Sequence, residues 1–102
     1  MVKSIRIALN WVRESPHGAY LSKGPAGTHA VVELTPDGPR GEAYWTAWRR
    51  DDVVDLFFDG CTSTSEQAFE SAEKAVGKIL AKLAEGGIQS AQIAIDEATR
   101  KA

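Results

Sequence analysis

Apolar and polar residues alternate at every second position in two stretches of the N-terminal half. In residues 3–13 the apolar positions are Ile5, Ile7, Leu9 and Trp11. Successive side chains of a β-strand point to opposite faces, so this alternation is typical of a strand with one buried face. Residues 29–34 repeat it, with Ala30, Val32 and Leu34 on one side. The pattern predicts a strand in each stretch.

Two further apolar runs flank a short charged segment and predict a β-hairpin over residues 42–59. In the second run one set of alternating positions is wholly apolar (Val54, Leu56 and Phe58), and the other is mixed (Val53, Asp55, Phe57 and Asp59). An unpaired carboxylate is costly to bury, so the apolar positions are expected to face the core. An even number of loop residues places Trp45 on that core side and Trp48 on the outer side, whereas an odd number exchanges them. We expect the even loop, although no Gly or Asn marks the turn type.

The connections between these strands are rich in glycine and proline. Residues 14–27 hold two prolines and three glycines, and residues 19–21 could add a short strand within them. Residues 35–39 read Thr-Pro-Asp-Gly-Pro, a strong turn signal, because Pro restricts φ and Gly accepts positive φ. The strands are therefore expected to join by local reversals, as in an antiparallel meander.

After Gly60 the spacing of apolar residues changes from two to three and four. A stripe of this spacing predicts an amphipathic helix over residues 65–85, formed by Phe69, Ala72, Val76, Ile79, Leu80 and Leu83. Two capping registers precede it, Ser63 with Glu66 and Thr64 with Gln67. Two consecutive glycines at 86 and 87 predict its end. Residues 88–101 favour a second, short helix because they are rich in helix formers, and a short strand is the alternative.

Together these elements predict a single α+β domain over residues 1–102. It would hold an antiparallel four-stranded β-meander, one long helix packed across one sheet face, and a short C-terminal helix. The predicted inward-facing residues are Ile5, Ile7, Leu9, Ala30, Val32, Leu34, Leu56 and Phe58 on the sheet, and Phe69, Val76, Ile79 and Leu83 on the helix. One long helix covers only one face, so the other face is expected to be open and to carry the function.

Composition narrows the classes of partner. The chain has 102 residues and a net charge of −2, and this balance counts against non-specific binding of a polyanion. No stretch approaches the length of a membrane-spanning helix, and no signal-peptide pattern begins the chain. The single cysteine, Cys61, forms no internal disulfide, which suits a reducing compartment. We therefore expect a cytoplasmic protein without a membrane partner.

Catalytic and metal-binding motifs do not stand out. His17 and His29 are the two histidines, and neither lies at metal-ligand spacing from the other or from Cys61. A Cys61–His29 nucleophile pair would lack an orienting carboxylate and oxyanion donors. Asp55 and Asp59 point to the same side of their strand but lie roughly 13 Å apart. We expect no enzymatic activity, no metal and no cofactor.

One group of residues suggests a binding surface, because aromatic and arginine side chains alternate along the hairpin and the first predicted strand. The candidate partner-binding residues are Tyr44, Trp48, Arg49, Arg50, Phe57, Arg6 and Arg13. Trp, Tyr and Arg are enriched at protein interfaces, and the same mixture can stack on nucleic-acid bases. Acidic residues at Asp51, Asp52, Asp55 and Asp59 interrupt the positive field and favour a protein partner. An ordinary amphipathic strand face is the simpler interpretation of the same residues.

The strand-to-helix junction carries one resemblance to a known family. Asp59-Gly60-Cys61 followed by Ser65-Glu66-Gln67-Ala68-Phe69 resembles the corresponding junction of HicB-type antitoxins. The Gly-x-Thr spacer of that junction is absent here and only a few positions agree, so the chain is not assigned to the family.

The leading hypothesis is a small, non-enzymatic protein-interaction module acting through the open sheet face and the hairpin tip. Compact domains of this kind are often accessory proteins of phage or mobile elements, including inhibitors that bind a larger host protein complex, and the hypothesis extends to such a role. The first alternative is a nucleic-acid-binding domain that uses the Arg/Trp-rich hairpin face, and its affinity should fall steeply with salt. The second is a homodimeric structural protein.

Overall fold

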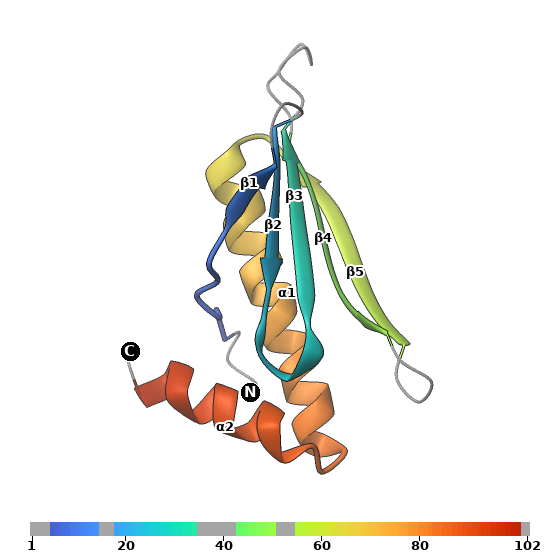
Figure 1. Ribbon diagram of the computed structural model, residues 1–102, viewed down its shortest axis with the longest axis vertical. Coiled ribbons are helices and arrows are strands. Elements are labelled where there is room, and N and C mark those ends of the chain that lie inside the picture. The colour runs from blue at the N-terminus through green and yellow to red at the C-terminus, as the bar shows by residue number, and fades with distance from the viewer. Residues whose placement is uncertain (1–4, 15–17, 35–42, 51–54, 101–102) are drawn as a thin grey trace.

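The computed structural model describes residues 5–14, 18–34, 43–50 and 55–100 (Figure 1). In this part of the chain, five strands form one antiparallel sheet in the order β1-β2-β3-β4-β5. Their bounds are β1 Val12–Glu14, β2 Ala19–Lys23, β3 His29–Leu34, β4 Ala43–Arg50 and β5 Asp55–Thr62. The predicted α+β class and antiparallel meander are confirmed, and the predicted count of four strands is wrong. The fifth strand arises because the short strand expected at residues 19–21 forms as β2.

Helix α1, Ser65–Glu85, packs across one face of the sheet and confirms the predicted long helix. It begins in the second of the two capping registers, since the backbone N–H of Gln67 donates to Thr64 Oγ1 at 3.2 Å. At its end Gly87 has a φ of +87°, and Ile88 N donates to Leu83 O at 3.0 Å. Gly87 N also donates to Ala84 O, completing a glycine-ended helix terminus that turns the chain toward the next element.

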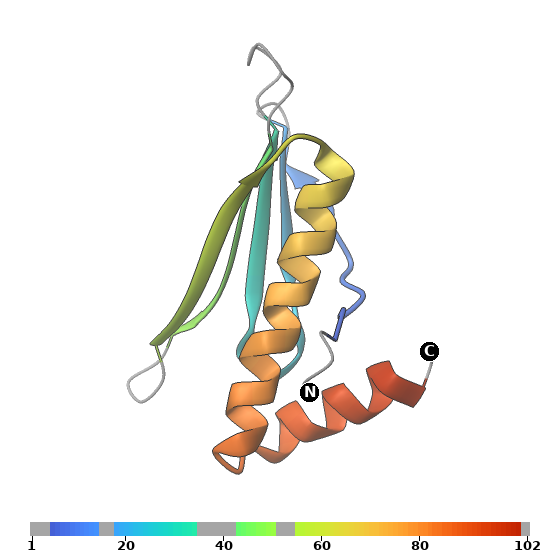
Figure 2. The same ribbon diagram turned by 180° about the vertical axis from the view of Figure 1, so that it is seen from behind.

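Helix α2, Gln89–Arg100, confirms the predicted short helix over the strand alternative. It runs away from the end of α1 at one end of the sheet (Figures 1 and 2). Its contacts are with α1 and with the 3-10 turn η1, Pro25–Gly27, and Ala91 is fully buried there. Helix α2 therefore closes the base of the core and leaves the far face of the sheet open.

The core lies between α1 and the sheet face beneath it, here called the inner face. Fully or almost fully buried alanines line both surfaces, namely Ala30, Ala43 and Ala47 on the strands and Ala68, Ala72 and Ala75 on the helix. Small side chains allow the helix to approach the sheet closely. Larger apolar residues, among them Val32, Val76, Ile79 and Leu80, fill the remaining space. All predicted inward-facing residues belong to this core or pack against it.

The predicted strand over residues 3–13 is wrong for most of its length. In the described part, only Val12–Glu14 joins the sheet as β1, and residues 5–11, here called the N-terminal strap, run beside α1 (Figure 2). Ile7 is buried, and its N–H donates to the backbone oxygen of Glu73 on α1 at 3.3 Å. A Cβ at Gly77 would collide with the Ile5 carbonyl oxygen, so the glycine lets the strap approach α1. Alternating apolar residues can thus pack on a helix as well as on a sheet.

The hairpin has the faces predicted for an even loop. Trp45 pairs with Gly60 and Ala47 with Phe58, so Trp45 shares the inner face with Phe58 and Leu56. Trp48 pairs with Phe57 on the opposite face. A Cβ at position 60 would lie 2.7 Å from Trp45 Nε1, so the glycine makes room for the indole ring. The hairpin turn and the predicted turn at residues 35–39 lie outside the described residues.

Candidate functional site

The outer face of the sheet, the face opposite α1, is the candidate site. The pairing register of the strands places most of its side chains in three rows that cross the strands. The first row is Lys23, His29, Trp48 and Phe57; the middle row is Val12, Leu21, Val31, Thr46 and Asp59; the last row is Glu14, Ala19, Glu33, Tyr44 and Cys61. Neither described helix covers this face (Figures 1 and 2).

Aromatic side chains gather on β4 and β5 of the outer face. Trp48 and Phe57 are direct cross-strand neighbours, and the His29 ring stacks on Trp48 with centroids 5.5 Å apart. Phe57 is 56% exposed and Tyr44 45% exposed. These fractions are high for large rings, which bury well over 100 Å² each when they enter a core. The outer face therefore offers aromatic surface that folding has not used.

A shallow depression of about 300 Å³ lies beside these rings. Its lining residues are Val31, Glu33, Thr46, Trp48, Arg50 and Phe57. The depression combines an apolar floor with one acidic and one basic rim residue. It can receive an apolar side chain of a partner while charged groups at the rim orient it.

Charges on the outer face are divided along the strand direction. Lys23 occupies the first row, and Arg50 lies one step beyond it, where it forms an ion pair with Asp55 at 3.2 Å. Glu14 and Glu33 occupy the last row. Apolar Val12, Leu21 and Val31 lie between the two charged ends. The face thus carries Lys23 toward one end and two glutamates at the other, with a middle row that is apolar on β1 to β3 and holds Thr46 and Asp59 on β4 and β5.

Four of the seven candidate partner-binding residues come together on this surface. They are Tyr44, Trp48, Arg50 and Phe57. Arg49 does not join them, because alternation along β4 places it on the inner face opposite Leu56. Position 27 lies close to it, since a Cβ there would be 3.2 Å from Arg49 Nε.

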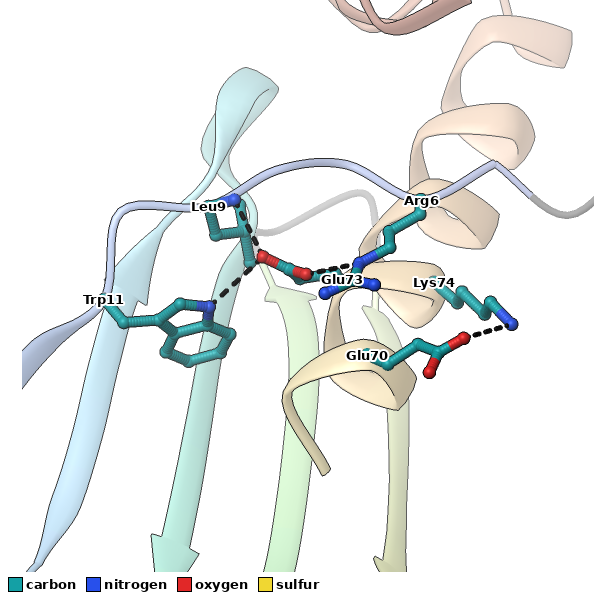
Figure 3. A network of polar contacts seen from close by, with 6 residues as sticks. All are labelled: Arg6, Leu9, Trp11, Glu70, Glu73 and Lys74. Carbon is teal, nitrogen blue, oxygen red and sulfur yellow. Dashed lines mark hydrogen bonds and ion pairs between the residues drawn. The ribbon is translucent and has the colours of Figure 1, made fainter. Parts of the chain in front are cut away.

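The other two arginines also lie away from the outer face. Arg13 pairs with Tyr20, whose ring contacts Phe69 of α1, so Arg13 belongs to the helix side of the sheet edge. Arg6 lies in the strap and donates to Glu73 Oε1 at 2.7 Å (Figure 3). The prediction placed Arg6 and Arg13 on one strand of the same sheet as the hairpin, whereas Arg6 lies in the strap, outside the sheet.

Glu73, a buried carboxylate on α1, accepts hydrogen bonds from the strap and was not predicted from the sequence (Figure 3). Glu73 is 5% exposed, and its Oε2 accepts hydrogen bonds from Leu9 N at 3.0 Å and from Trp11 Nε1 at 3.2 Å. With Arg6, three donors satisfy one carboxylate, as burial of a charged group requires. One signal could have revealed it, because position 73 is four residues after Phe69 and three before Val76 on the apolar stripe.

The chemical groups considered from sequence remain dispersed. His29 and Cys61 both project from the outer face, but from opposite end rows and two strands apart. Asp55 and Asp59 share the outer face at a spacing of four residues along β5. Within the described ranges, no three His, Cys, Asp or Glu side chains form a group that could hold a metal ion. His17 lies outside those ranges.

Comparison with known proteins leaves the family open. No protein-family model, no curated protein and no solved structure matches the chain significantly. In the part of the chain that the structure describes, no helix is long and apolar enough to cross a membrane.

Proposed function

We propose that the chain is a protein-interaction module that binds its partner through the outer face of the sheet. One observation carries the proposal: the aromatic side chains of Tyr44, Trp48 and Phe57 all project from one face of a five-stranded sheet, and neither described helix covers this face. Rigid aromatic side chains on a sheet lose little conformational entropy on binding and are enriched among the residues that dominate interface energies. A regular sheet also holds them in place before the partner arrives, which lowers the entropic cost of association.

The charge pattern favours a protein over a nucleic acid. A nucleic-acid surface needs basic residues along the path of the phosphates, because phosphate neutralisation supplies most of the affinity. On the outer face, Arg50 is paired with Asp55, and Asp59, Glu33 and Glu14 add acidic groups to the same surface. A polyanion would meet repulsion across half of the face. We therefore propose a protein as the partner, and binding rather than catalysis as the activity. A larger host complex as the target stays a prediction from sequence.

The test is affinity capture from lysate with a matched pair of variants. Unmodified chain, a Trp48→Ala/Phe57→Ala double variant and an Ile93→Ala variant are immobilised, and capture is run at two salt concentrations with and without nuclease. Ile93 is 52% exposed on α2 and away from the sheet, so it controls for the loss of any exposed apolar side chain. The proposal expects a protein retained after nuclease and at high salt, lost with the double variant and kept with Ile93→Ala.

Two results would overturn the proposal. Capture that needs nucleic acid and disappears at high salt would support the nucleic-acid alternative. Capture that the double variant leaves unchanged would show that the outer face is not the binding surface.

A further inference from the structure

We propose that the partner of the outer face is a second copy of this chain, packed sheet against sheet with its strands running in the opposite direction across the interface. This inference rests on the proposed function, because it uses the same face, and it adds the identity of the partner. The layout of charges along the strands supports it.

A face-to-face pair of identical sheets has its two-fold axis in the plane of the interface. An axis parallel to the strands along β3 would keep each row over itself, so Glu33 would meet its own copy and Lys23 would lie over Trp48, away from any carboxylate. An axis perpendicular to the strands, through the middle row, reverses the ends. Each end that carries Lys23 then lies over the acidic end of the other copy. Charge complementarity therefore selects the perpendicular axis.

Lys23 shows the complementarity most clearly. On reversal it lies over Ala19 of the second copy, because both occupy the outer face of β2 at equal distances from the middle row. Ala19 is small and leaves space for the lysine side chain. Its two cross-strand neighbours are Glu14 on β1 and Glu33 on β3, so the ammonium group would enter between two carboxylates.

The remaining rows also match under the same axis. Leu21 and Val31 of the middle row meet their own copies and form the apolar centre of the contact. Trp48 of the first row meets Tyr44 of the last row, which pairs two large aromatic side chains at each end. An apolar centre with polar groups around it is the usual anatomy of a protein interface.

The size of the face sets the expected strength. Five strands about 4.8 Å apart and three rows of side chains cover roughly 400–500 Å² per copy. The total of roughly 1,000 Å² is below that of a standard stable interface. Asp59 of the middle row would also meet its own copy at the β5 edge, which weakens the pair. A weak dimer is therefore expected, and the measurement must reach high concentration.

The test is sedimentation equilibrium of the purified chain from about 10 μM to about 1 mM, a range that covers weak association. Lys23→Glu and Glu33→Lys should each raise the dissociation constant roughly tenfold at low salt, because two symmetric contacts change from attraction to repulsion. The Lys23→Glu/Glu33→Lys double variant should restore it to within about threefold. Within one chain these positions lie four residues apart along neighbouring strands, so only a contact between copies explains the restoration.

Leu21→Lys tests the apolar centre, since it brings two lysines together at the middle row, and it should leave the chain monomeric. Ile93→Lys on α2 is the matched control and should leave the dissociation constant unchanged. Thermal unfolding of every variant shows whether it is folded.

The outcomes separate this inference from the proposed function. A monomer up to the highest concentration refutes the second copy, and if Trp48→Ala/Phe57→Ala still abolishes capture from lysate, the proposed function stands alone. A dimer that ignores Leu21→Lys and the charge variants forms through another surface, such as the β5 edge, and refutes the inference. Loss of both effects removes the inference and the proposed function together.

Discussion

The covered face of the sheet carries small side chains on β3 and β4, whereas the face exposed to solvent carries large aromatic side chains on β4 and β5. The inner face, under α1, carries alanine at three positions of β3 and β4, all at most 1% exposed. The outer face carries Trp48, Tyr44 and Phe57 on β4 and β5, and two of these rings are about half exposed. The large aromatic side chains of the hairpin are thus divided between its two faces: Trp45 and Phe58 lie on the inner face, and Trp48 and Phe57 lie on the outer face.

This division shows which constraint acts on each face. A helix that lies close to a sheet leaves little depth for side chains, so small residues on both surfaces fill the space at crystal-like density. The outer face has no such limit, and its large rings contribute little to folding while they remain in water. Aromatic residues at those positions add little to the stability of the monomer, which agrees with the proposed binding role of the outer face.

The largest expected effect comes from truncating the covered side. Ile79 is fully buried in α1, so Ile79→Ala should reduce the free energy of unfolding by about 2–5 kcal/mol. Phe57→Ala removes a larger side chain from the outer face, yet should cost less than about 1 kcal/mol because the ring is already exposed. Urea unfolding of both variants at a concentration where the chain is monomeric measures the difference. Equal losses would contradict the division between the faces.

A smaller effect is expected from the carboxylate that fastens the strap to the covered side. Glu73→Ala leaves the Leu9 N–H and the Trp11 indole N–H without their acceptor and should cost about 2 kcal/mol. Arg6→Ala should cost under about 1 kcal/mol, because the arginine side chain is half exposed and its partner keeps two donors.

Amide hydrogen exchange at Leu9 gives the local measurement for this prediction. Exchange should accelerate strongly in Glu73→Ala and little in Arg6→Ala, with β3 and β4 amides unaffected beyond the global loss of stability. Unchanged protection at Leu9 in Glu73→Ala would mean that apolar packing alone holds the strap.

The smallest expected effect concerns the exposed surface of α1 and depends on pH. A hydrogen bond from Lys74 and its positive charge hold the pKa of Glu70 below its ordinary value of 4.5. The folded state therefore binds this proton less readily than the unfolded state. The resulting stabilisation is present above the ordinary pKa and is lost as pH falls through the lowered pKa of the folded state.

A side-chain NMR titration checks this direction. Lys74→Met should raise the pKa of Glu70 toward 4.5, and Lys78→Met, one turn further along α1, should leave it unchanged. A pKa of Glu70 that does not move in Lys74→Met would remove Lys74 as the cause.

Local patterns were sufficient for the elements whose partners are near in sequence. The cap at Thr64, the stripe of α1 and the glycines after Glu85 all act within a few residues, and the helix begins and ends where they predict. The faces of β4 and β5 follow from period-two alternation and the parity of the connection, so Trp45 and Trp48 were assigned to the correct sides. Five of the seven candidate site residues lie on this hairpin. Four of them share the outer face, and the same alternation places the fifth, Arg49, on the inner face.

Contacts distant in sequence decided the rest. Alternation in residues 5–11 predicts that one side of the segment is buried, but it does not predict whether a sheet or a helix covers that side. Glu73, more than 60 residues away, settles that choice by accepting from Arg6, Leu9 and Trp11, which draws the strap onto α1.

The sequence by itself determined the order of the elements from β3 to α2, the amphipathic faces of β3, β4, β5 and α1, and the shared face of Tyr44, Trp48 and Phe57, because periodicity and turn chemistry are local. Only the tertiary structure decided that the strap leaves the sheet, that Arg6 and Arg13 lie away from the aromatic group, and that charges divide along the outer face. Each of these depends on the register between strands and on a helix packing across them. Register and packing are set by the sum of many distant contacts, which no single stretch of the chain contains.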